Sequence, residues 1–131
     1  MNLTIDTSAL LAVVGNEPTK DKIIRLSVGY SLFAPSSAHW EVGNAFSAMF
    51  KHRSISIEAA IAALAEYQKI PIKFIDISLE KALELSSKLN IYAYDAYLIQ
   101  CALQTGTQLL TLDRGLIEAS KNMGVECLEV W

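Results

Sequence analysis

The sequence predicts a single α/β domain, residues 1–131, with a mostly parallel sheet covered by helices on both faces. The length of 131 residues is typical of one domain. Hydrophobic residues make up 52% and charged residues 19% of the chain, as in a compact globular protein. Short β-type runs alternate with helical segments, and this alternation indicates parallel strands because a parallel neighbour requires a crossover, usually a helix.

The first half of the chain predicts two strands and four helices. In order, they are strand 3–5, helix 9–14, helix 19–28, strand 32–34, helix 38–52 and helix 54–68. Short apolar runs define the strands, and a segment with Gly and Pro separates the first two helices. Helical spacing places Ile23 and Ile24 on the buried side of the second helix, and Trp40 and Phe50 among the packed residues of the third. Ser56 or Ser54 is a plausible cap of the fourth.

The second half continues the alternation. In order, we expect strand 70–75, helix 78–89, helix 94–103, strand 108–112, helix 113–121 and strand 125–130. Ser78 opens an amphipathic helix, whereas the nearly apolar helix that follows is expected to be buried around most of its circumference and to end near Gly106. Cys101 and Cys127 have no metal-type spacing and are interpreted as core residues.

Charge and hydropathy restrict the possible functions. A net charge of −3 argues against a protein that holds nucleic acid mainly by its own basic surface. An RNA substrate would therefore require a bound metal ion, helped by local basic segments such as residues 51–53. No apolar run is long enough to cross a membrane and no signal peptide is recognisable, so we expect a cytoplasmic protein without a membrane partner.

Two aspartates directly follow strands and precede helices. Asp6 comes after the first strand, and Asp113 comes after the strand at 108–112. Each could simply cap the helix that follows, which is a common role of Asp. In a parallel sheet, however, the ligand crevice lies at the carboxyl ends of the strands, and both residues occupy that edge. The pair is therefore also a candidate for a functional site.

Two further acids stand in apolar surroundings. Glu41 lies within a helix between Trp40 and Val42, where the ordinary alternative is a side chain that reaches solvent. Asp95 is preceded and followed by apolar and aromatic residues, and an unpaired buried charge would cost several kcal/mol. A first-turn position near the helix dipole is the ordinary explanation for Asp95. Otherwise a cation must lie nearby.

If the four acids converge, their repulsion raises at least one carboxyl pKa, and a divalent cation removes that penalty. Oxygen ligands favour Mg²⁺, with Mn²⁺ as a possible substitute, over zinc. The expected chemistry is hydrolysis of a phosphodiester by a metal-activated water. Ser8, Asn44 and Thr111 could orient a ligand carboxylate or a water, although each could equally be an ordinary cap or core residue.

Four motifs resemble those of PIN-domain proteins, and their order and spacing agree along essentially the whole chain. They are Ile5-Asp6-Thr7-Ser8-Ala9-Leu10, Trp40-Glu41-Val42-Gly43-Asn44-Ala45, Tyr94-Asp95-Ala96-Tyr97-Leu98 and Leu109-Leu110-Thr111-Leu112-Asp113-Arg114-Gly115. A single domain of this length resembles the VapC toxins of toxin–antitoxin pairs. The resemblance implies a three-layer α/β/α sandwich and an Mg²⁺-dependent endoribonuclease, in which Asp6, Glu41, Asp95 and Asp113 bind the metal. It also implies a homodimer, and a cognate antitoxin whose C-terminal segment enters the active-site groove.

The sequence departs from some PIN nucleases in having no further Asp or Asn shortly after the last motif, where Arg114 and Gly115 stand instead. One alternative function is a receiver-type signalling module, in which Asp76 would be the phosphate acceptor. Such a module would need a Lys where Asp113 stands. A second alternative is a PIN-like protein that binds RNA without cleaving it.

Overall fold

Four strands and seven helices make up the structure, a computed structural model that describes residues 1–131. In chain order they are β1 (Asn2–Ile5), α1 (Thr7–Val14), α2 (Lys20–Ser27), β2 (Ser31–Pro35), α3 (Ala38–Lys51), α4 (Ile57–Lys69), β3 (Ile72–Ile75), α5 (Leu79–Leu89), α6 (Ala93–Thr105), β4 (Gln108–Leu110) and α7 (Arg114–Asn122). The predicted alternation of strands and helices is confirmed. None of the helices is both long and apolar enough to span a lipid bilayer.

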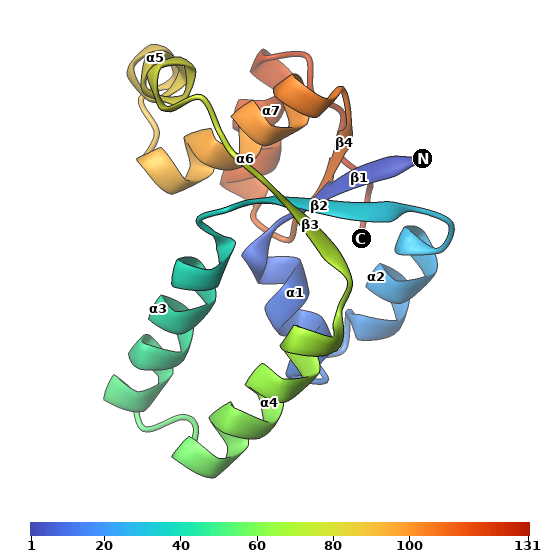
Figure 1. Ribbon diagram of the computed structural model, residues 1–131, viewed down its shortest axis with the longest axis vertical. Helices are drawn as coiled ribbons and strands as arrows, with labels where there is room; N and C mark the ends of the chain where they lie inside the picture. Colours follow the sequence, from blue (N-terminus) through green and yellow to red (C-terminus); the bar gives the residue numbers. More distant parts are fainter.

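The four strands form one parallel sheet in the order β3-β2-β1-β4. In its register Leu3 of β1 lies opposite Leu32 of β2 on one side and Gln108 of β4 on the other. The chain first adds β2 and β3 outward from β1, and it then returns to the other side of β1 to form β4 (Figure 1). The strand order therefore reverses between β1 and β4, the position where open parallel sheets usually bind ligands.

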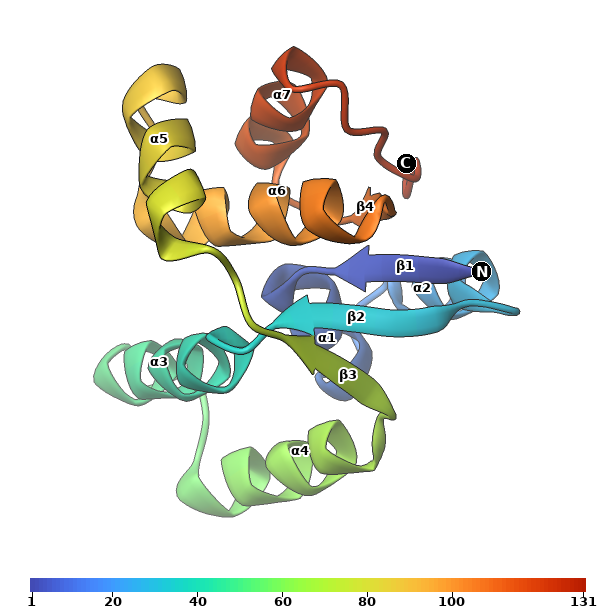
Figure 2. The ribbon, with the colours of Figure 1, turned by 45° about the horizontal axis from the view of Figure 1, so that its top comes forward.

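Helices cover both faces of the sheet, as the sequence predicted. Helices α1 to α4 lie on one side of the strands, and α5 to α7 lie on the other (Figure 1; Figure 2 shows the layers from a second direction). Each side has its own hydrophobic core. The first core includes Leu10, Ile23 and Phe46, and the second includes Leu85, Ile99 and Leu116. The protein is thus a three-layer α/β/α sandwich.

Alternation along the strands supplies both cores. Leu110 of β4 packs into the first core, whereas the neighbouring Leu109 packs into the second. In β1, the buried Thr4 bonds through its Oγ1 atom with Thr107 Oγ1 at 2.7 Å and lies 3.6 Å from Cys101 Sγ. Cys101 is therefore a buried residue that packs in the interior, as predicted.

Several helix ends agree with their sequence signals. The Ser56 Oγ atom accepts the Ala59 N–H at 3.1 Å and caps α4, which decides between the two serines considered. Ser78 caps α5 in the same way. Gly106 ends α6 with a φ of 65°, a left-handed conformation that glycine adopts without strain.

The strand predicted at 125–130 was wrong. The segment makes one isolated bridge, between Cys127 and Leu109, and its backbone bonds join Leu109 N–H to Glu126 O and Leu128 N–H to Leu109 O. Because β4 has only three residues, it offers too short an edge for a full ladder. Cys127 is consequently only partly buried.

Two predicted packing faces were also partly wrong. In α2, Ile23 is buried but Ile24 is 43% exposed. In α3, Trp40 is 73% exposed and Phe50 is 38% exposed, so only part of the apolar spacing of this helix faces the core. Trp40 and Phe50 were assigned to the core from helical spacing, which shows which residues share a face but not how much of that face is covered.

Candidate active site

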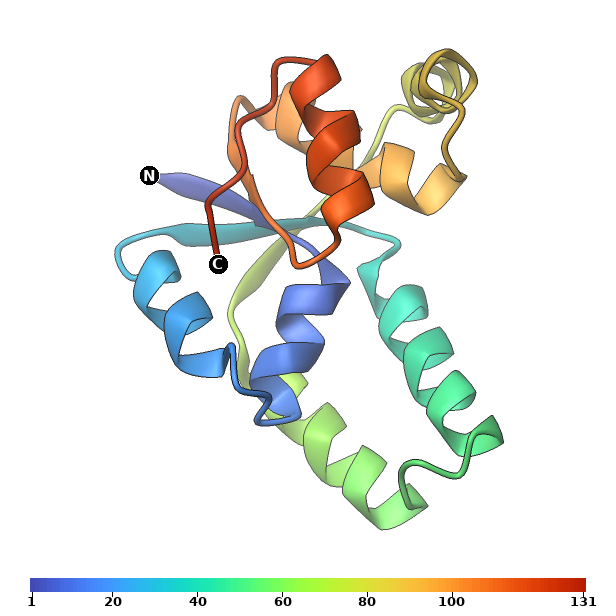
Figure 3. The ribbon, with the colours of Figure 1, turned by 180° about the vertical axis from the view of Figure 1, so that it is seen from behind.

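The first two predicted acids lie at the carboxyl ends of adjacent strands. Asp6 follows β1, and its N–H donates to Leu110 O at 3.0 Å, which continues the pairing with β4 for one residue. Asp113 stands three residues beyond the end of β4. Both aspartates therefore lie beside the reversal of strand order, near the first turns of α1 and α7 (Figure 3).

The buried carboxylate of Asp6 is held by three donors. Its Oδ1 atom accepts the Ser8 N–H at 3.1 Å, which makes Asp6 the N-cap of α1. Its Oδ2 atom accepts the Ser8 Oγ–H at 2.8 Å and also the Thr111 hydroxyl. Since a carboxylate has about four lone-pair positions, this arrangement fixes the orientation of Asp6 and leaves room for one further contact.

The same hydroxyl groups connect Asp6 to Asp113. Ser8 Oγ accepts the Leu112 N–H at 3.0 Å, and Thr111 Oγ1 accepts the Asp113 N–H at 3.0 Å. Asp113 in turn accepts the Leu116 N–H at 3.1 Å through Oδ1 and caps α7. The capping role considered for each aspartate is real, and one network holds both carboxylates in position.

Glu41 lies in the first turn of α3, with its carboxyl group directed toward α1. The Thr7 hydroxyl donates to Glu41 Oε2 at 3.0 Å. Burial raises the pKa of Glu41 to about 7, and the negative charges of Asp6 and Asp95 raise it further against the opposing effect of the Thr7 hydrogen bond. Close to neutral pH, Glu41 is therefore poised between its protonated and ionised forms.

Asp95 occupies the first turn of α6 and is partly buried. Burial raises its pKa above the ordinary value, and the charges of Asp113 and Asp6 add to this effect. No hydrogen bond from a side chain or backbone group satisfies its carboxylate. The helix dipole favours this position, but it leaves the repulsion from the neighbouring acids uncompensated.

These electrostatic effects connect all four predicted acids. The charge of Asp6 raises the pKa of both Glu41 and Asp95. The charge of Asp95 also raises the pKa of Glu41, and the charge of Asp113 raises that of Asp95. The structure thus brings the four carboxylates to one edge of the sheet, from residues as far apart in sequence as 6 and 113. It does not bring three of them close enough to hold one ion without rearrangement.

The available donors fit an oxygen-preferring divalent cation. They are four carboxylates, accompanied by the hydroxyls of Thr7, Ser8 and Thr111, and no histidine or cysteine takes part. This is the ligand chemistry of Mg²⁺ or Mn²⁺ and not that of zinc. The raised pKa values of Glu41 and Asp95 indicate an excess of negative charge that a cation would offset. The residues present therefore fit such an ion chemically, although their side chains would have to move together.

The predicted supporting residues fare differently. Ser8 and Thr111 bond directly to Asp6. Asn44 is exposed on α3 and makes no hydrogen bond to any of the acids. Thr7, which contacts Glu41, had not been singled out, although it stands next to Asp6 in the Asp-Thr-Ser motif.

A second residue near Glu41 was also missed. Tyr67 of α4 is buried, and its hydroxyl lies 2.9 Å from His39 Nδ1. Burial raises the pKa of Tyr67, and the charge of Glu41 raises it further. Nothing local in the sequence of α4 indicates this proximity, because it arises from the packing of helices beside the sheet.

The position of Asp76 does not suit a receiver-type site. Asp76 follows β3, which is an edge strand, so it is separated from β1 by the whole width of β2. A receiver-type module places its phosphate-accepting aspartate after a central strand. Asp76 is not among the charges that raise the pKa of Glu41 or Asp95.

Comparison with known proteins identifies relatives of this arrangement. Residues 3–122 match the family described as the PIN domain. No curated protein matches the chain in sequence.

Three solved structures share the fold. The PAE2754 protein of Pyrobaculum aerophilum is 24% identical, with a TM-score of 0.71 and coverage of 99% of this chain and 91% of that one. VapBC2 from Rickettsia felis, bound to a DNA fragment from its promoter, is 16% identical, with a TM-score of 0.72 and coverage of 98% of each chain. VapC20 of Mycobacterium tuberculosis, a toxin that cleaves the sarcin–ricin loop, is 16% identical, with a TM-score of 0.65 and coverage of 90% and 95%.

Proposed function

This chain belongs to the PIN domain family, and we propose that it is a divalent-metal-dependent endoribonuclease whose active site contains Asp6, Glu41, Asp95 and Asp113. We further propose that residues 1–131 form a single nuclease domain. In support, both hydrophobic cores pack against the same sheet. Mg²⁺ is the proposed cofactor, with Mn²⁺ as a substitute.

One observation carries this proposal. Four carboxylates from separate parts of the chain influence one another at the reversal of strand order, and burial and mutual repulsion raise the pKa of Glu41 to about 7. Such a concentration of negative charge destabilises the fold and is expected where the protein binds a cation for function. Capping alone would account for Asp6 and Asp113, but not for Glu41 and Asp95.

The chain's own residues would prepare the site for an ion and a phosphate. Ser8 and Thr111 fix the orientation of Asp6, Thr7 fixes that of Glu41, and α7 fixes that of Asp113 through its cap. Asp95 is held only by its helix, so it has the freedom to move toward a ligand. When bound, a divalent cation supplies positive charge that neutralises the phosphodiester and makes a water molecule more acidic.

The fold supports a further proposal on partners. VapC20 is a toxin that cleaves the sarcin–ricin loop, and VapBC2 is bound to a DNA fragment from its promoter. By analogy, we propose that this chain is the toxin of a toxin–antitoxin pair, with an RNA substrate and a cognate antitoxin protein. A homodimer and a cytoplasmic location belong to the same proposal.

The decisive experiment incubates the purified chain with total RNA in the presence of Mg²⁺ or EDTA. We expect cleavage in Mg²⁺ only, and a loss of more than about 100-fold in the Asp95→Asn variant, because loss of a metal ligand exceeds the effect of changing its supporting residues. The matched control is Glu84→Gln, which removes the charge of an exposed glutamate on α5 and should leave cleavage unchanged. Cleavage that persists in EDTA, or in Asp95→Asn, would contradict the assignment.

A further inference from the structure

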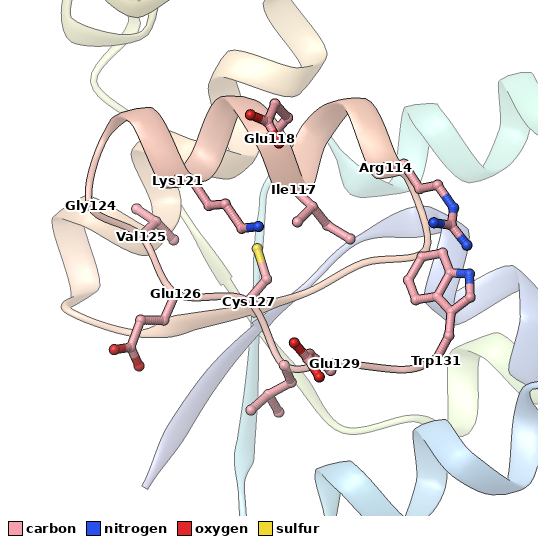
Figure 4. A pocket seen from close by; sticks show the side chains of 11 residues that line it. Arg114, Ile117, Glu118, Lys121, Gly124, Val125, Glu126, Cys127, Glu129 and Trp131 are labelled. Carbon is pink, nitrogen blue, oxygen red and sulfur yellow. The ribbon is translucent and has the colours of Figure 1, made fainter.

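A groove runs along one side of α7, opposite the segment formed by residues 124–131. It has a volume of about 920 Å³. Arg114 and Trp131 stand at one end and Val125 lies toward the other, with Ile117 and Cys127 between them (Figure 4). The groove therefore has an apolar floor, and an arginine and a tryptophan lie together at one end of it.

That end contains a stacked pair of side chains. The guanidinium carbon of Arg114 lies 4.5 Å from the centre of the Trp131 ring, a typical cation–π contact. The arginine faces one side of the ring, and the tryptophan remains 56% exposed. Trp131 is therefore held in place by Arg114 while much of its surface stays accessible to another planar group.

Arg114 adjoins the candidate active site along the chain. Arg114 directly follows Asp113, whose carboxylate caps α7 and acts on Asp95. A nucleic acid strand with one phosphate at the acidic edge would consequently have its neighbouring nucleotide within reach of Arg114.

The charges of the groove restrict how such a strand could lie. Besides Arg114 and Lys121, the groove is lined by Glu118, Glu126 and Glu129. Phosphates running along its length would meet three carboxylates, which is unfavourable. An uncharged base can enter the groove, and the Arg114 end offers a cation for its phosphate.

We propose that Arg114 and Trp131 form a stacking platform for one unpaired base of the RNA substrate, next to the phosphate bound at the acidic edge. The ring of Trp131 stacks with the base, and Arg114 contacts the adjoining phosphate while it supports the ring. Because a base within a duplex is already stacked and paired, the platform selects single-stranded segments. This inference rests on the proposed ribonuclease function and adds to it a residue pair that recognises the substrate.

Fluorescence of Trp131 tests the platform without catalysis. The chain has two tryptophans, so the tryptophan emission of a Trp40→Phe, Asp95→Asn protein comes from Trp131 alone, and this protein does not cleave. In Mg²⁺, which the acidic edge needs in order to hold a phosphate, single-stranded oligouridylate should quench this emission in a saturable manner. A duplex of the same length should bind more weakly by roughly 5- to 100-fold, the range expected for loss of one stacked base.

Substitutions at the pair provide the second measurement, with binding followed by the anisotropy of labelled RNA. Trp131→Leu keeps an apolar side chain without the aromatic face and should weaken single-strand binding by roughly 5- to 100-fold, whereas Trp131→Phe should retain most of it. Arg114→Lys keeps the charge but loses the planar stack and should give an intermediate loss. Arg25→Lys, at an exposed site on α2, is the matched control and should bind normally.

Equal binding by Trp131→Leu and the unsubstituted background would overturn the platform, as would an equal preference for duplex and single strand. Cleavage assays then separate this outcome from failure of the proposed function. If an otherwise unchanged Trp131→Leu protein cleaves RNA with the original KM and kcat, the platform is wrong but the nuclease stands. If Trp131 emission is quenched by single-stranded RNA and the wild-type chain never cleaves RNA, the platform stands and the nuclease fails.

Discussion

Glu41 is the residue whose ionisation responds most strongly to its surroundings. Its ordinary pKa of 4.5 is raised to about 7, first by burial and then by the charges of Asp6 and Asp95. A proton on Glu41 therefore relieves part of the repulsion at the sheet edge. Addition of a divalent cation would relieve the same repulsion, so protonation and metal binding compete.

This competition predicts how stability depends on pH in the absence of metal. Because the pKa of Glu41 is higher in the folded chain than in the unfolded one, the folded state binds more protons between pH 4.5 and about 7, and the free energy of unfolding falls as the pH rises through this range. In the Glu41→Gln variant, the decrease in the free energy of unfolding over this pH range should be smaller by about 1–2 kcal/mol. This figure is lower than the full pKa shift implies, because the carboxyl group is partly exposed to solvent. Urea denaturation of both proteins in EDTA at pH 5 and pH 8 measures the effect.

Gln keeps the size and hydrogen-bonding capacity of Glu41, so the two proteins should have similar stability at pH 5, and the variant should be the more stable one at pH 8. Parallel pH profiles for both proteins would show that Glu41 does not carry the raised pKa. Glu84→Gln on α5 controls for removing a negative charge elsewhere.

At the level of elements, the turn between β4 and α7 combines a structural and a functional role. Thr111 bonds to Asp6 and accepts the Asp113 N–H, and the Asp113 carboxylate caps α7. The short strand β4 thereby fixes both aspartates through a few backbone and hydroxyl groups. Capping and metal binding use the same carboxylate, which is why the sequence alone left both possibilities open.

Two substitutions of Asp113 separate these roles. Asn caps a helix about as well as Asp does, whereas Ala does not, so Asp113→Asn should keep the stability that Asp113→Ala loses, a difference of about 1 kcal/mol. Both variants should lose cleavage, because neither provides an anionic ligand. Thermal denaturation and the RNA assay together distinguish the two effects. A fully active Asp113→Asn protein would reduce Asp113 to a helix cap.

Ser56 of α4 provides the comparison for a pure cap. Its Oγ atom accepts the Ala59 N–H at an exposed position, and Ser56 makes no hydrogen bond to any of the four acids. Ser56→Ala should therefore lose a similar amount of stability, about 1 kcal/mol, and retain RNA cleavage in full.

The sequence predicted most elements because each strand and helix carries its own local signal. Alternation of short apolar runs with capped helices was sufficient for the parallel sheet and its two covered faces. The prediction of a strand at 125–130 was wrong. This segment is mostly apolar, but its partner β4 is only three residues long and pairs with it through a single bridge. The prediction that Trp40 and Phe50 are packed was wrong for a related reason, since helical spacing does not reveal whether a neighbouring element covers that face of the helix.

At the level of the whole molecule, the site could be predicted only in outline. Asp6 and Asp113 were identifiable from strand ends, and the structure places them as expected. The contact of Thr7 with Glu41 and the closeness of Tyr67 to Glu41 depend on packing among α1, α3 and α4. Asn44 was selected from its motif, but α3 directs it to solvent.

Electrostatic repulsion at one edge of the whole fold predicts that a divalent cation stabilises the protein. A ligand that binds only the folded state adds about 2.7 kcal/mol at 100 times its dissociation constant. Mg²⁺ should therefore raise the melting temperature by several degrees at pH 8, and by less at pH 5.5, where Glu41 is protonated. Differential scanning calorimetry measures both shifts, with KCl at matched ionic strength as the control.

The shift should also diminish in Asp95→Asn, although that variant should be more stable than the wild type without metal, because one repelling charge is gone. Equal stabilisation of the wild type by Mg²⁺ and KCl would argue for general screening of charge and against a specific ion site.

The order of strands also affects the newly made chain on the ribosome. Asp6 is synthesised well before β4 and Asp113, which follow it by about a hundred residues although β4 pairs directly with β1. Domains fold as they emerge, N-terminal parts first. A growing polypeptide therefore has no assembled acidic edge until β4 and Asp113 have left the exit tunnel, so the proposed ribonuclease could not cut its own messenger before that point.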